Sequence, residues 1–193
     1  MIILLSGNSC TGKTLMSQRL LEKYHIPYLS IDHLKMGLFR GDRNCGFTPL
    51  DSTEVISEKL WPIIKGIILT SIENEQNLII EGCYLLPQYV KEIENAYNGN
   101  IITVFLGFST KYINENFINI TKFRNAIENR AYPEERTIDE FINEHVECRT
   151  KCLEHGMMYF EIDQDYEEEI NKVYDYIDLK MKGPILKVLR GNN

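Results

Sequence analysis

The chain of 193 residues carries 28 acidic and 21 basic side chains, which gives a formal net charge of −7 at pH 7. Hydrophobic residues make up 44% of the chain and charged residues 25%, a composition typical of a globular protein rather than of a disordered or fibrous one. The acidic balance argues against nucleic acid as the main partner, because proteins that bind nucleic acids usually carry a basic patch or stripe. The length suits one domain with a sizeable core, so we expect a single domain over residues 1–193.

The sequence shows no sign of a membrane or secretory segment. No apolar stretch approaches the roughly 20 residues that a helix needs to span a bilayer. The opening letters MIILLSG run into a glycine-containing segment without a basic leader or a cleavage site, so we expect a strand there and not a signal peptide. Five cysteines in irregular spacing do not form the pattern of a disulfide framework. We therefore expect a reduced, cytoplasmic protein with no membrane partner.

Short apolar runs alternate along the chain with longer helical patterns, which is typical of a parallel sheet covered by helices. Each predicted strand is a near-continuous apolar run of the kind expected for strands that are buried on both faces. The predicted strands cover residues 2–6, 28–31, 78–81, 101–106 and 159–162, and the predicted helices cover residues 13–24, 52–74, 87–97, 111–130, 138–155 and 167–181. The sequence therefore predicts the α/β class, with a five-stranded parallel sheet in a three-layer α/β/α arrangement.

The first predicted strand is followed by GNSCTGKT, residues 7–14, which matches the pattern G-x-x-x-x-G-K-[ST] of a phosphate loop at every fixed position. Gly7 and Gly12 allow backbone turns that point successive N–H groups inward at a phosphate. In such loops the lysine, here Lys13, reaches the β- and γ-phosphates, and the hydroxyl of Thr14 can ligate magnesium. The helix that follows adds the positive end of its dipole. We expect ATP and Mg²⁺ to bind at Gly7, Asn8, Ser9, Cys10, Thr11, Gly12, Lys13 and Thr14.

Further motifs narrow the class of phosphate-loop protein. A GTPase would carry a base-reading N-K-x-D after a later strand, and the sequence has none. The segments IDHLKMGLFRG and FRNAIENR…EER…CRTKC…YFEID resemble bacterial proteins described as 2-phosphoglycerate-kinase-like or adenylate-kinase-like. They are also similar to kinases of the zeta-toxin and chloramphenicol phosphotransferase type. Over essentially the whole chain this resemblance implies a P-loop kinase that transfers the γ-phosphoryl group of ATP to a small anionic or polar acceptor.

Asp32 follows the second predicted strand, and ligands of open α/β sheets bind at the carboxyl ends of the strands. Kinases of the resembled kind that phosphorylate hydroxyls place an aspartate here, where its carboxylate takes the proton of the acceptor hydroxyl. If the acceptor is a phosphate, as in adenylate kinase, no base is required and Asp32 would position the substrate or magnesium. An N-cap of the next helix is the structural alternative.

The segment LIIEGCY places Glu81 at the end of the third predicted strand, where a carboxylate can hold magnesium directly or through water. Adenylate kinases usually have an aspartate at this place, and capping of the next helix is the structural alternative for Glu81. Gly82 would let the backbone approach the substrate closely. The segment from residue 36 to residue 49, MGLFRGDRNCGFTP, has the composition of a loop. Its Arg40 and Arg43 either clamp an anionic acceptor or are solvated surface charges.

A helical lid is predicted at about residues 122–137, on the segment KFRNAIENRAYPEER. Arg124, Arg130 and Arg136 stand six residues apart, so they converge only where the chain bends, and Pro133 favours a bend. In related kinases the arginines of a lid close over the γ-phosphate, which implies a catalytic role for Arg130 and Arg124. Pairing with nearby glutamates on a plain helix surface is the alternative.

One apparent metal motif is better explained by packing. His145, Cys148, Cys152 and His155 fall on one helical stripe, and all four are residue types that ligate zinc. A helix rises about 1.5 Å per residue, so the first and the last of them would stand about 15 Å apart and could not reach one ion. We therefore expect these four residues to form a buried stripe and not to bind a metal ion.

Three functions stay open at this point. The favoured one is an ATP-dependent kinase acting on a hydroxyl of a metabolite or nucleotide-like substrate. The alternatives are a nucleoside monophosphate kinase of the adenylate type and a nucleotide-binding regulatory protein without transfer activity. The sequence does not decide the identity of the acceptor or the oligomeric state.

Overall fold

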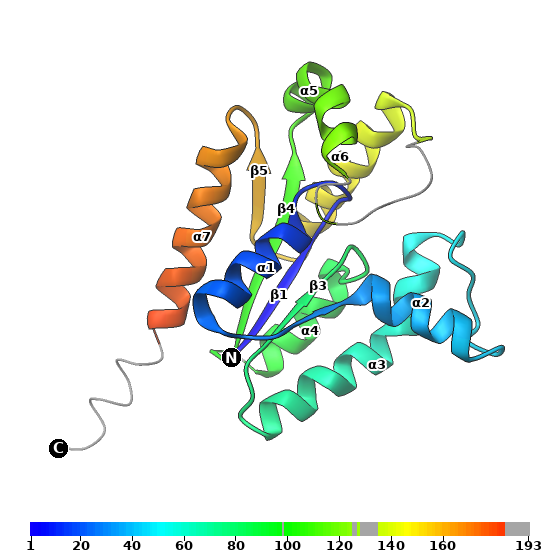
Figure 1. Ribbon diagram of the computed structural model, residues 1–193, viewed down its shortest axis with the longest axis vertical. Coiled ribbons are helices and arrows are strands. Elements are labelled where there is room, and N and C mark those ends of the chain that lie inside the picture. Colours follow the sequence, from blue (N-terminus) through cyan, green and yellow to red (C-terminus); the bar gives the residue numbers. More distant parts are fainter. Residues whose placement is uncertain (98, 125–126, 128–134, 184–193) are drawn as a thin grey trace.

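Figure 1 shows the computed structural model of the chain, which describes residues 1–97, 99–124, 127 and 135–183. Its five strands are all parallel and form one sheet in the order β2-β3-β1-β4-β5. They are β1 (Ile2–Gly7), β2 (Tyr28–Ser30), β3 (Leu78–Glu81), β4 (Ile101–Phe108) and β5 (Tyr159–Ile162). The predicted five-stranded parallel sheet is confirmed, and β4 is longer than expected because it continues through Gly107 to Phe108.

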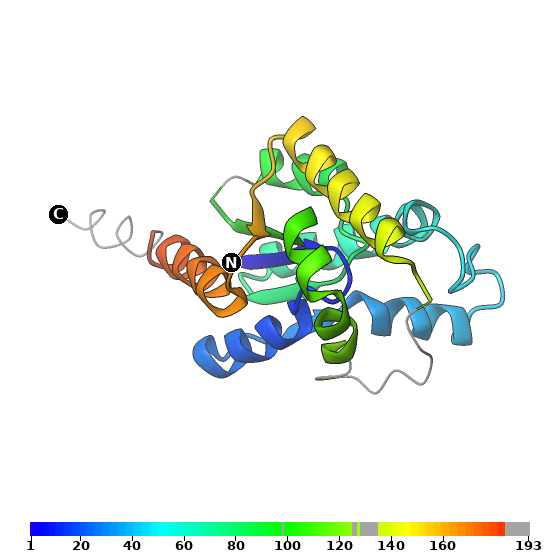
Figure 2. The same cartoon turned by 90° about the horizontal axis from the view of Figure 1, so that it is seen from above.

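Helices cover both faces of the sheet, which gives the predicted three-layer arrangement (Figure 2). One face carries α1 (Lys13–Tyr24) and α7 (Tyr166–Lys182), and the other carries α3 (Thr53–Glu73), α4 (Pro87–Ala96) and α6 (Ile138–Glu154). Helix α5 (Thr110–Phe123) follows the tip of β4 beyond the carboxyl edge of the sheet, and α2 (Ile31–Gly41) follows β2 at the other end of that edge. The carboxyl edge is therefore flanked by α2 and α5.

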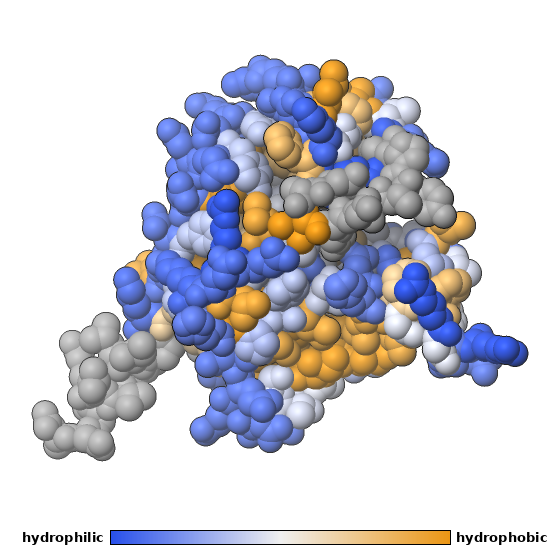
Figure 3. Space-filling view, in the orientation of Figure 1, coloured by the Kyte–Doolittle hydropathy of each residue, from blue (hydrophilic) through white to orange (hydrophobic). Residues whose placement is uncertain are grey.

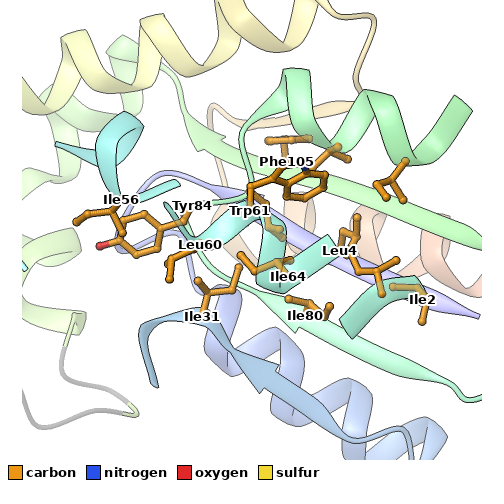
Figure 4. Close-up of a cluster of buried hydrophobic side chains, with 14 of the residues drawn as sticks. Ile2, Leu4, Ile31, Ile56, Leu60, Trp61, Ile64, Ile80, Tyr84 and Phe105 are labelled. Atoms are coloured by element: carbon orange, nitrogen blue, oxygen red, sulfur yellow. The ribbon is translucent and has the colours of Figure 1, made fainter. Parts of the chain in front are cut away.

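The central strand β1 is buried on both faces, and its residues alternate between two hydrophobic clusters. Ile2 and Leu4 point into the cluster under α3 and α4, where Figure 4 shows them with Phe105 of β4. Ile3 and Leu5 point into the other cluster, which includes residues of α1 and α7. This two-sided burial explains why the sequence of β1 is a continuous apolar run rather than an alternating one.

Helix α2 replaces the first part of the loop that the sequence predicted over residues 36–49, so that prediction was wrong as far as Gly41. The helix forms because Ile31, Leu34 and Leu38 present an apolar face to the cluster under α3. Its two glycines lower helix stability by about 1 kcal/mol each relative to alanine, and burial of the apolar face outweighs that cost. Asp32 consequently lies in the first turn of a helix and not in a loop.

The face of the molecule shown in Figure 3 is mainly hydrophilic. One larger apolar area lies low in this view, at the position of α3 in Figure 1. Val55 and Ile63 are exposed apolar side chains of that helix. Among the described residues, no helix is long and apolar enough to cross a membrane. All five cysteines are free thiols, in agreement with their irregular spacing.

The end of β1 depends on the absence of a side chain at Gly7. This residue has a φ of +113°, and a Cβ there would lie 2.0 Å from the carbonyl oxygen of Leu106 in β4. We expect Gly7→Ala to lower the free energy of unfolding by more than about 2 kcal/mol, because β1 and β4 would have to separate. Urea denaturation followed by circular dichroism measures the change.

Gly37→Ala is the matched control for this substitution. Gly37 lies in α2, and a Cβ there would meet no atom within 4 Å. This variant should be as stable as the wild type or more stable by up to about 1 kcal/mol. A Gly7→Ala protein with wild-type stability would show that the two strand ends are not held at this separation.

Candidate active site

The phosphate loop, residues 7–14, connects β1 to α1 and curls tightly. Gly12 is the N-cap of α1 with a φ of +86°, and Cys10 also adopts a left-handed conformation with a φ of +64°. The amino end of α1 therefore opens directly into the loop, where the unpaired N–H groups and the helix dipole favour an anion. A loop of this shape at a helix amino end is suited to binding phosphate.

Lys13 places a buried positive charge within this loop. Its Nζ donates to the carbonyl oxygen of Asn8 at 2.5 Å and to Oγ1 of Thr11 at 3.4 Å. The Thr11 hydroxyl donates to the same Asn8 carbonyl at 2.9 Å. Lys13 is 8% exposed, so its side chain is held by the loop and does not extend into solvent.

A hydroxyl and a carboxylate meet beside the loop. Thr14 donates from its Oγ1 to Oε1 of Glu81 at 3.4 Å, and Glu81 is only 3% exposed. Glu81 reaches this point because β3 pairs with β1 in the register that sets it opposite Leu5. Oxygen ligands of this kind suit Mg²⁺, which is usually held by one or two carboxylates together with substrate phosphates. No group of three metal-ligating side chains occurs in the described part of the chain, so a magnesium ion here would rely on this small donor set.

Gly82 allows α2 to approach the end of β3. A Cβ at Gly82 would lie 2.9 Å from the Cβ of Ile31, the first residue of α2. The space beside Gly82 is thus filled by the helix. This close packing brings the first turn of α2 to the carboxyl edge of the sheet, where Glu81 lies.

Asp32, Lys35 and Tyr84 form a connected polar cluster at this end of the edge. The Nζ of Lys35 donates to Oδ1 of Asp32 and to the hydroxyl oxygen of Tyr84, both at 2.8 Å. The side chain of Lys35 is 11% exposed, whereas that of Asp32 is 39% exposed. The N-cap of α2 is Ser30, so the N-cap interpretation of Asp32 was wrong.

The pKa values of Lys35 and Tyr84 keep both groups protonated at neutral pH. Burial lowers the pKa of Lys35, but its hydrogen bonds to Asp32 and Tyr84 and the charge of Asp32 outweigh burial and hold the pKa above its ordinary value. Burial is also the main cause that raises the pKa of Tyr84 to about 12. The cluster therefore offers a fixed cation and a neutral hydroxyl.

Sequence reasoning missed Lys35 and Tyr84. The spacing of Asp32 and Lys35, three residues apart, is a signal for an ion pair only where the segment is helical. No helix was predicted over residues 31–41, so that signal was not available.

The groups described so far line one cleft with a volume of about 1210 Å³. Asp32, Lys35 and Tyr84 lie at the α2 end, the phosphate loop lies between, and residues of α5 and α7 line the other end. At that other end the hydroxyl of Tyr166 donates to the carbonyl oxygen of Thr11 at 3.3 Å. A Cβ at Gly12 would lie 2.0 Å from the same hydroxyl, so Tyr166 rests directly on the loop.

The arrangement of strands and helices in this chain is also found in solved structures of other proteins. No family model matches the sequence, and no curated protein matches it. Solved structures do match: shikimate kinase from Aquifex aeolicus is 18% identical, with a TM-score of 0.57 and coverage of 95% of this chain and 99% of that chain. A sugar kinase from Janibacter sp. is 15% identical, with a TM-score of 0.54 and coverage of 92% and 94%. A gluconokinase from Sinorhizobium meliloti is 14% identical, with a TM-score of 0.50 and coverage of 94% and 96%.

This is the fold of the P-loop kinases. At identities below 20% the likeness concerns the arrangement of the elements. In P-loop kinases, as in open α/β sheets generally, ligands bind at the carboxyl edge, which is where the cleft lies here. What the cleft does depends on the side chains of this chain.

The two arginines that were predicted to contact an acceptor, Arg40 and Arg43, take different positions. Arg40 lies in the last turn of α2 and lines the cleft with its side chain exposed. Arg43 lies beyond α2, is exposed, and is not among the residues that line the cleft. The structure therefore brings Arg40, and not Arg43, to the cleft.

The predicted lid is described in part. Helix α5 ends at Phe123, and Arg124 follows it as the C-cap and lines the cleft. Arg136 donates to Oε2 of Glu144 at 2.6 Å and lies over the ring of Phe141. Arg130 lies outside the described residues, so its role stays a prediction.

Three of the four residues of the predicted stripe pack in the core, whereas His155 follows α6 as its C-cap and is only partly buried. Cys152 is fully buried and Cys148 is half-buried against the cluster under α3. His145 is 1% exposed, and its Nδ1 accepts the backbone N–H of Phe108 at 2.9 Å. The imidazole thus fixes the end of β4 and is a neutral packing group.

The neutral state of His145 makes the stability of the protein depend on pH. Burial, with smaller contributions from the charges of Lys13 and Arg136, lowers the pKa of His145 to about 3 from the ordinary value of 6.5. Between these two pH values the unfolded chain binds one more proton than the folded protein, so stability falls as the pH falls. We expect a loss of up to about tenfold in the folding equilibrium constant per pH unit below pH 6.5.

Urea denaturation at several pH values between about 5 and 7 tests this effect in the wild type and in His145→Gln. Glutamine cannot be protonated, so the variant should lose stability less steeply with falling pH, whatever its stability at pH 7. Equal slopes in the two proteins would contradict a neutral, buried His145.

Proposed function

We propose that this protein is a cytoplasmic ATP-dependent kinase that transfers the γ-phosphoryl group of ATP to a hydroxyl of a small metabolite or nucleotide-like molecule. The observation that carries the proposal is that a phosphate loop, the Thr14–Glu81 pair and the half-exposed carboxylate of Asp32 line one cleft. The likeness to kinases named for shikimate, a sugar and gluconate supports an acceptor that is small and bears hydroxyl groups.

In this proposal the donor half of the site binds the triphosphate. Backbone N–H groups of residues 7–14 donate to the β- and γ-phosphates, and the Lys13 ammonium balances their charge. Thr14 and Glu81 would hold Mg²⁺, which when bound neutralises charge on the phosphate oxygens. Tyr166 and the residues of α5 then face the nucleoside end of ATP.

The acceptor half orients the attacking hydroxyl. Asp32 accepts its hydrogen bond and takes its proton as the hydroxyl oxygen forms a bond to the γ-phosphorus. The bond from that phosphorus to the bridging oxygen breaks, and its electron pair leaves with ADP. Arg124, with Arg130 as predicted for the lid, stabilises the transferring group, while Arg40, which lines the cleft, contacts an anionic part of the acceptor.

The charges around Asp32 favour a hydroxyl acceptor over a phosphate acceptor. The cation nearest to Asp32, Lys35, is already bonded to Asp32 and Tyr84. A phosphate acceptor at Asp32 would bring two anions together, which is unfavourable in a partly buried site. A hydroxyl carries no charge and can donate to the exposed part of the carboxylate.

Lys13→Ala tests the donor half. We expect ATP turnover to fall by at least about 100-fold, because a fixed cation at the transferring phosphate is lost. The fold should persist, since the Lys13 ammonium bonds only to its own loop among the described residues. A coupled assay of ADP release measures turnover, and thermal denaturation followed by circular dichroism monitors the fold.

Lys23→Ala is the matched control, because Lys23 lies on the same helix and pairs with Asp178 at the surface. Its turnover should equal that of the wild type. If Lys13→Ala turned over ATP at the wild-type rate, the proposed donor site would be wrong.

Asp32→Asn distinguishes the two kinds of kinase. The acceptor is first found by incubating the protein with MgATP and shikimate, gluconate, sugars, nucleoside monophosphates or phosphorylated metabolites, with mass spectrometry of the products. For a hydroxyl acceptor, Asp32→Asn should lower kcat by about 100-fold or more, because the proton acceptor is lost. A nucleoside monophosphate product with a mild effect of Asp32→Asn would favour the adenylate-type alternative. Tight ATP binding without any product would favour a regulatory protein.

A further inference from the structure

The Tyr84 hydroxyl has a proton that the described residues do not use. A lysine ammonium has three N–H donors and no acceptor, so in the contact with Lys35 the Tyr84 oxygen accepts. The hydroxyl proton must then be donated elsewhere. Among the residues that the structure describes, this hydroxyl makes no hydrogen bond other than the one from Lys35. Burial holds the pKa of Tyr84 at about 12, so this proton is present at neutral pH.

This hydroxyl belongs to the cleft although Tyr84 is only 7% exposed. A buried donor without an acceptor costs about 1–3 kcal/mol. An oxygen atom bound in the cleft beside Asp32 would remove that cost. The geometry therefore indicates a second point of contact for the acceptor, in addition to Asp32.

The separation of the two contact points limits the kind of acceptor. Oδ1 of Asp32 and the Tyr84 oxygen both lie 2.8 Å from the same nitrogen of Lys35. They are thus no more than about 5.6 Å apart, and about 4.6 Å apart if the two N–H bonds keep a tetrahedral angle. Oxygens on neighbouring carbon atoms are about 3 Å apart, so one can donate to Asp32 while the other accepts from Tyr84 at ordinary hydrogen-bond lengths.

We propose that Lys35 is a positioning residue that sets Asp32 and Tyr84 as a two-point site for an acceptor whose reacting hydroxyl stands next to a second oxygen, as in a vicinal diol. This inference rests on the proposed kinase function. The reacting hydroxyl gives its proton to Asp32 when its oxygen attacks the γ-phosphorus, and ADP leaves with the electron pair of the broken bond. The neighbouring oxygen accepts a hydrogen bond from Tyr84 and undergoes no bond change.

Tyr84→Phe tests the second contact point, because phenylalanine keeps the ring that packs in the core and removes only the hydroxyl. The acceptor found by the screen is compared with the deoxy analogue that lacks the oxygen on the carbon next to the phosphorylated position, for example glucose with 2-deoxyglucose if the product carries its phosphate on O1 or O3. The wild type should prefer the vicinal compound by about tenfold or more in kcat/KM. In Tyr84→Phe the preference should fall to within about threefold. A wild type that uses both compounds equally, or a Tyr84→Phe variant that keeps the preference, would overturn the inference.

Lys35→Met and Lys35→Arg test the positioning role. Methionine keeps the length and the apolar stem without the charge, and we expect it to lower kcat at least about tenfold while the KM for MgATP stays within about twofold. Arginine keeps a donor for both partners and should restore part of kcat. Lys91→Met, at a lysine paired with Glu94 on α4, is the control that should change neither value. Equal losses in Lys35→Met and Lys35→Arg would assign Lys35 a purely structural role.

A measurement without any acceptor completes the test. The ammonium of Lys35 can be titrated by NMR in the wild type, in Asp32→Asn and in Tyr84→Phe. Each substitution should lower the pKa of Lys35, because each removes a hydrogen bond that holds this pKa above its ordinary value. An unchanged pKa in both variants would overturn the positioning role. A protein that turns over ATP with no preference for a neighbouring oxygen overturns this inference alone, whereas one that neither binds nor turns over MgATP overturns the proposed function.

Discussion

The parallel pairing of β1 with β3 and β4 is the constraint on which the rest of the site depends. It sets Leu5 opposite Glu81 and Gly7 opposite Leu106, so the carboxylate and the start of the phosphate loop reach the same edge. A shift of β3 by one residue would turn Glu81 to the other face of the sheet, away from Thr14. The absence of a side chain at Gly7 lets β1 and β4 stay close up to the first residue of the loop.

The two ends of the cleft are held by different parts of the fold. At the α7 end Tyr166, the first residue of that helix, rests on Gly12 and donates a hydrogen bond to the phosphate loop. At the α2 end this helix packs against Gly82, and Lys35 joins it to Tyr84. The Asp32–Lys35 pair carries no net charge, so in our proposal the acceptor is selected mainly by the placement of hydrogen-bonding atoms.

The likeness to shikimate kinase, a sugar kinase and gluconokinase concerns the arrangement of strands and helices, at identities of 14–18%. One fold of this kind supports many functions, so the function must be inferred from side chains that belong to this chain. In our proposal the phosphate loop binds the nucleotide, and residues at the α2 end such as Asp32, Lys35 and Tyr84 select the second substrate.

The sequence by itself determined the five strands, the phosphate loop and the carboxylates at the carboxyl edge. Short local patterns predict these features, namely apolar runs, the segment GNSCTGKT, and polar residues directly after strands. Only the tertiary structure decided that residues 31–41 are helical, because that helix depends on packing of its apolar face more than on its own residue preferences. It likewise decided that Lys35 meets Tyr84, 49 residues away, and that Tyr166 meets Thr11, 155 residues away. Contacts between such distant segments leave no periodic signal in the sequence, since they arise from how the elements pack.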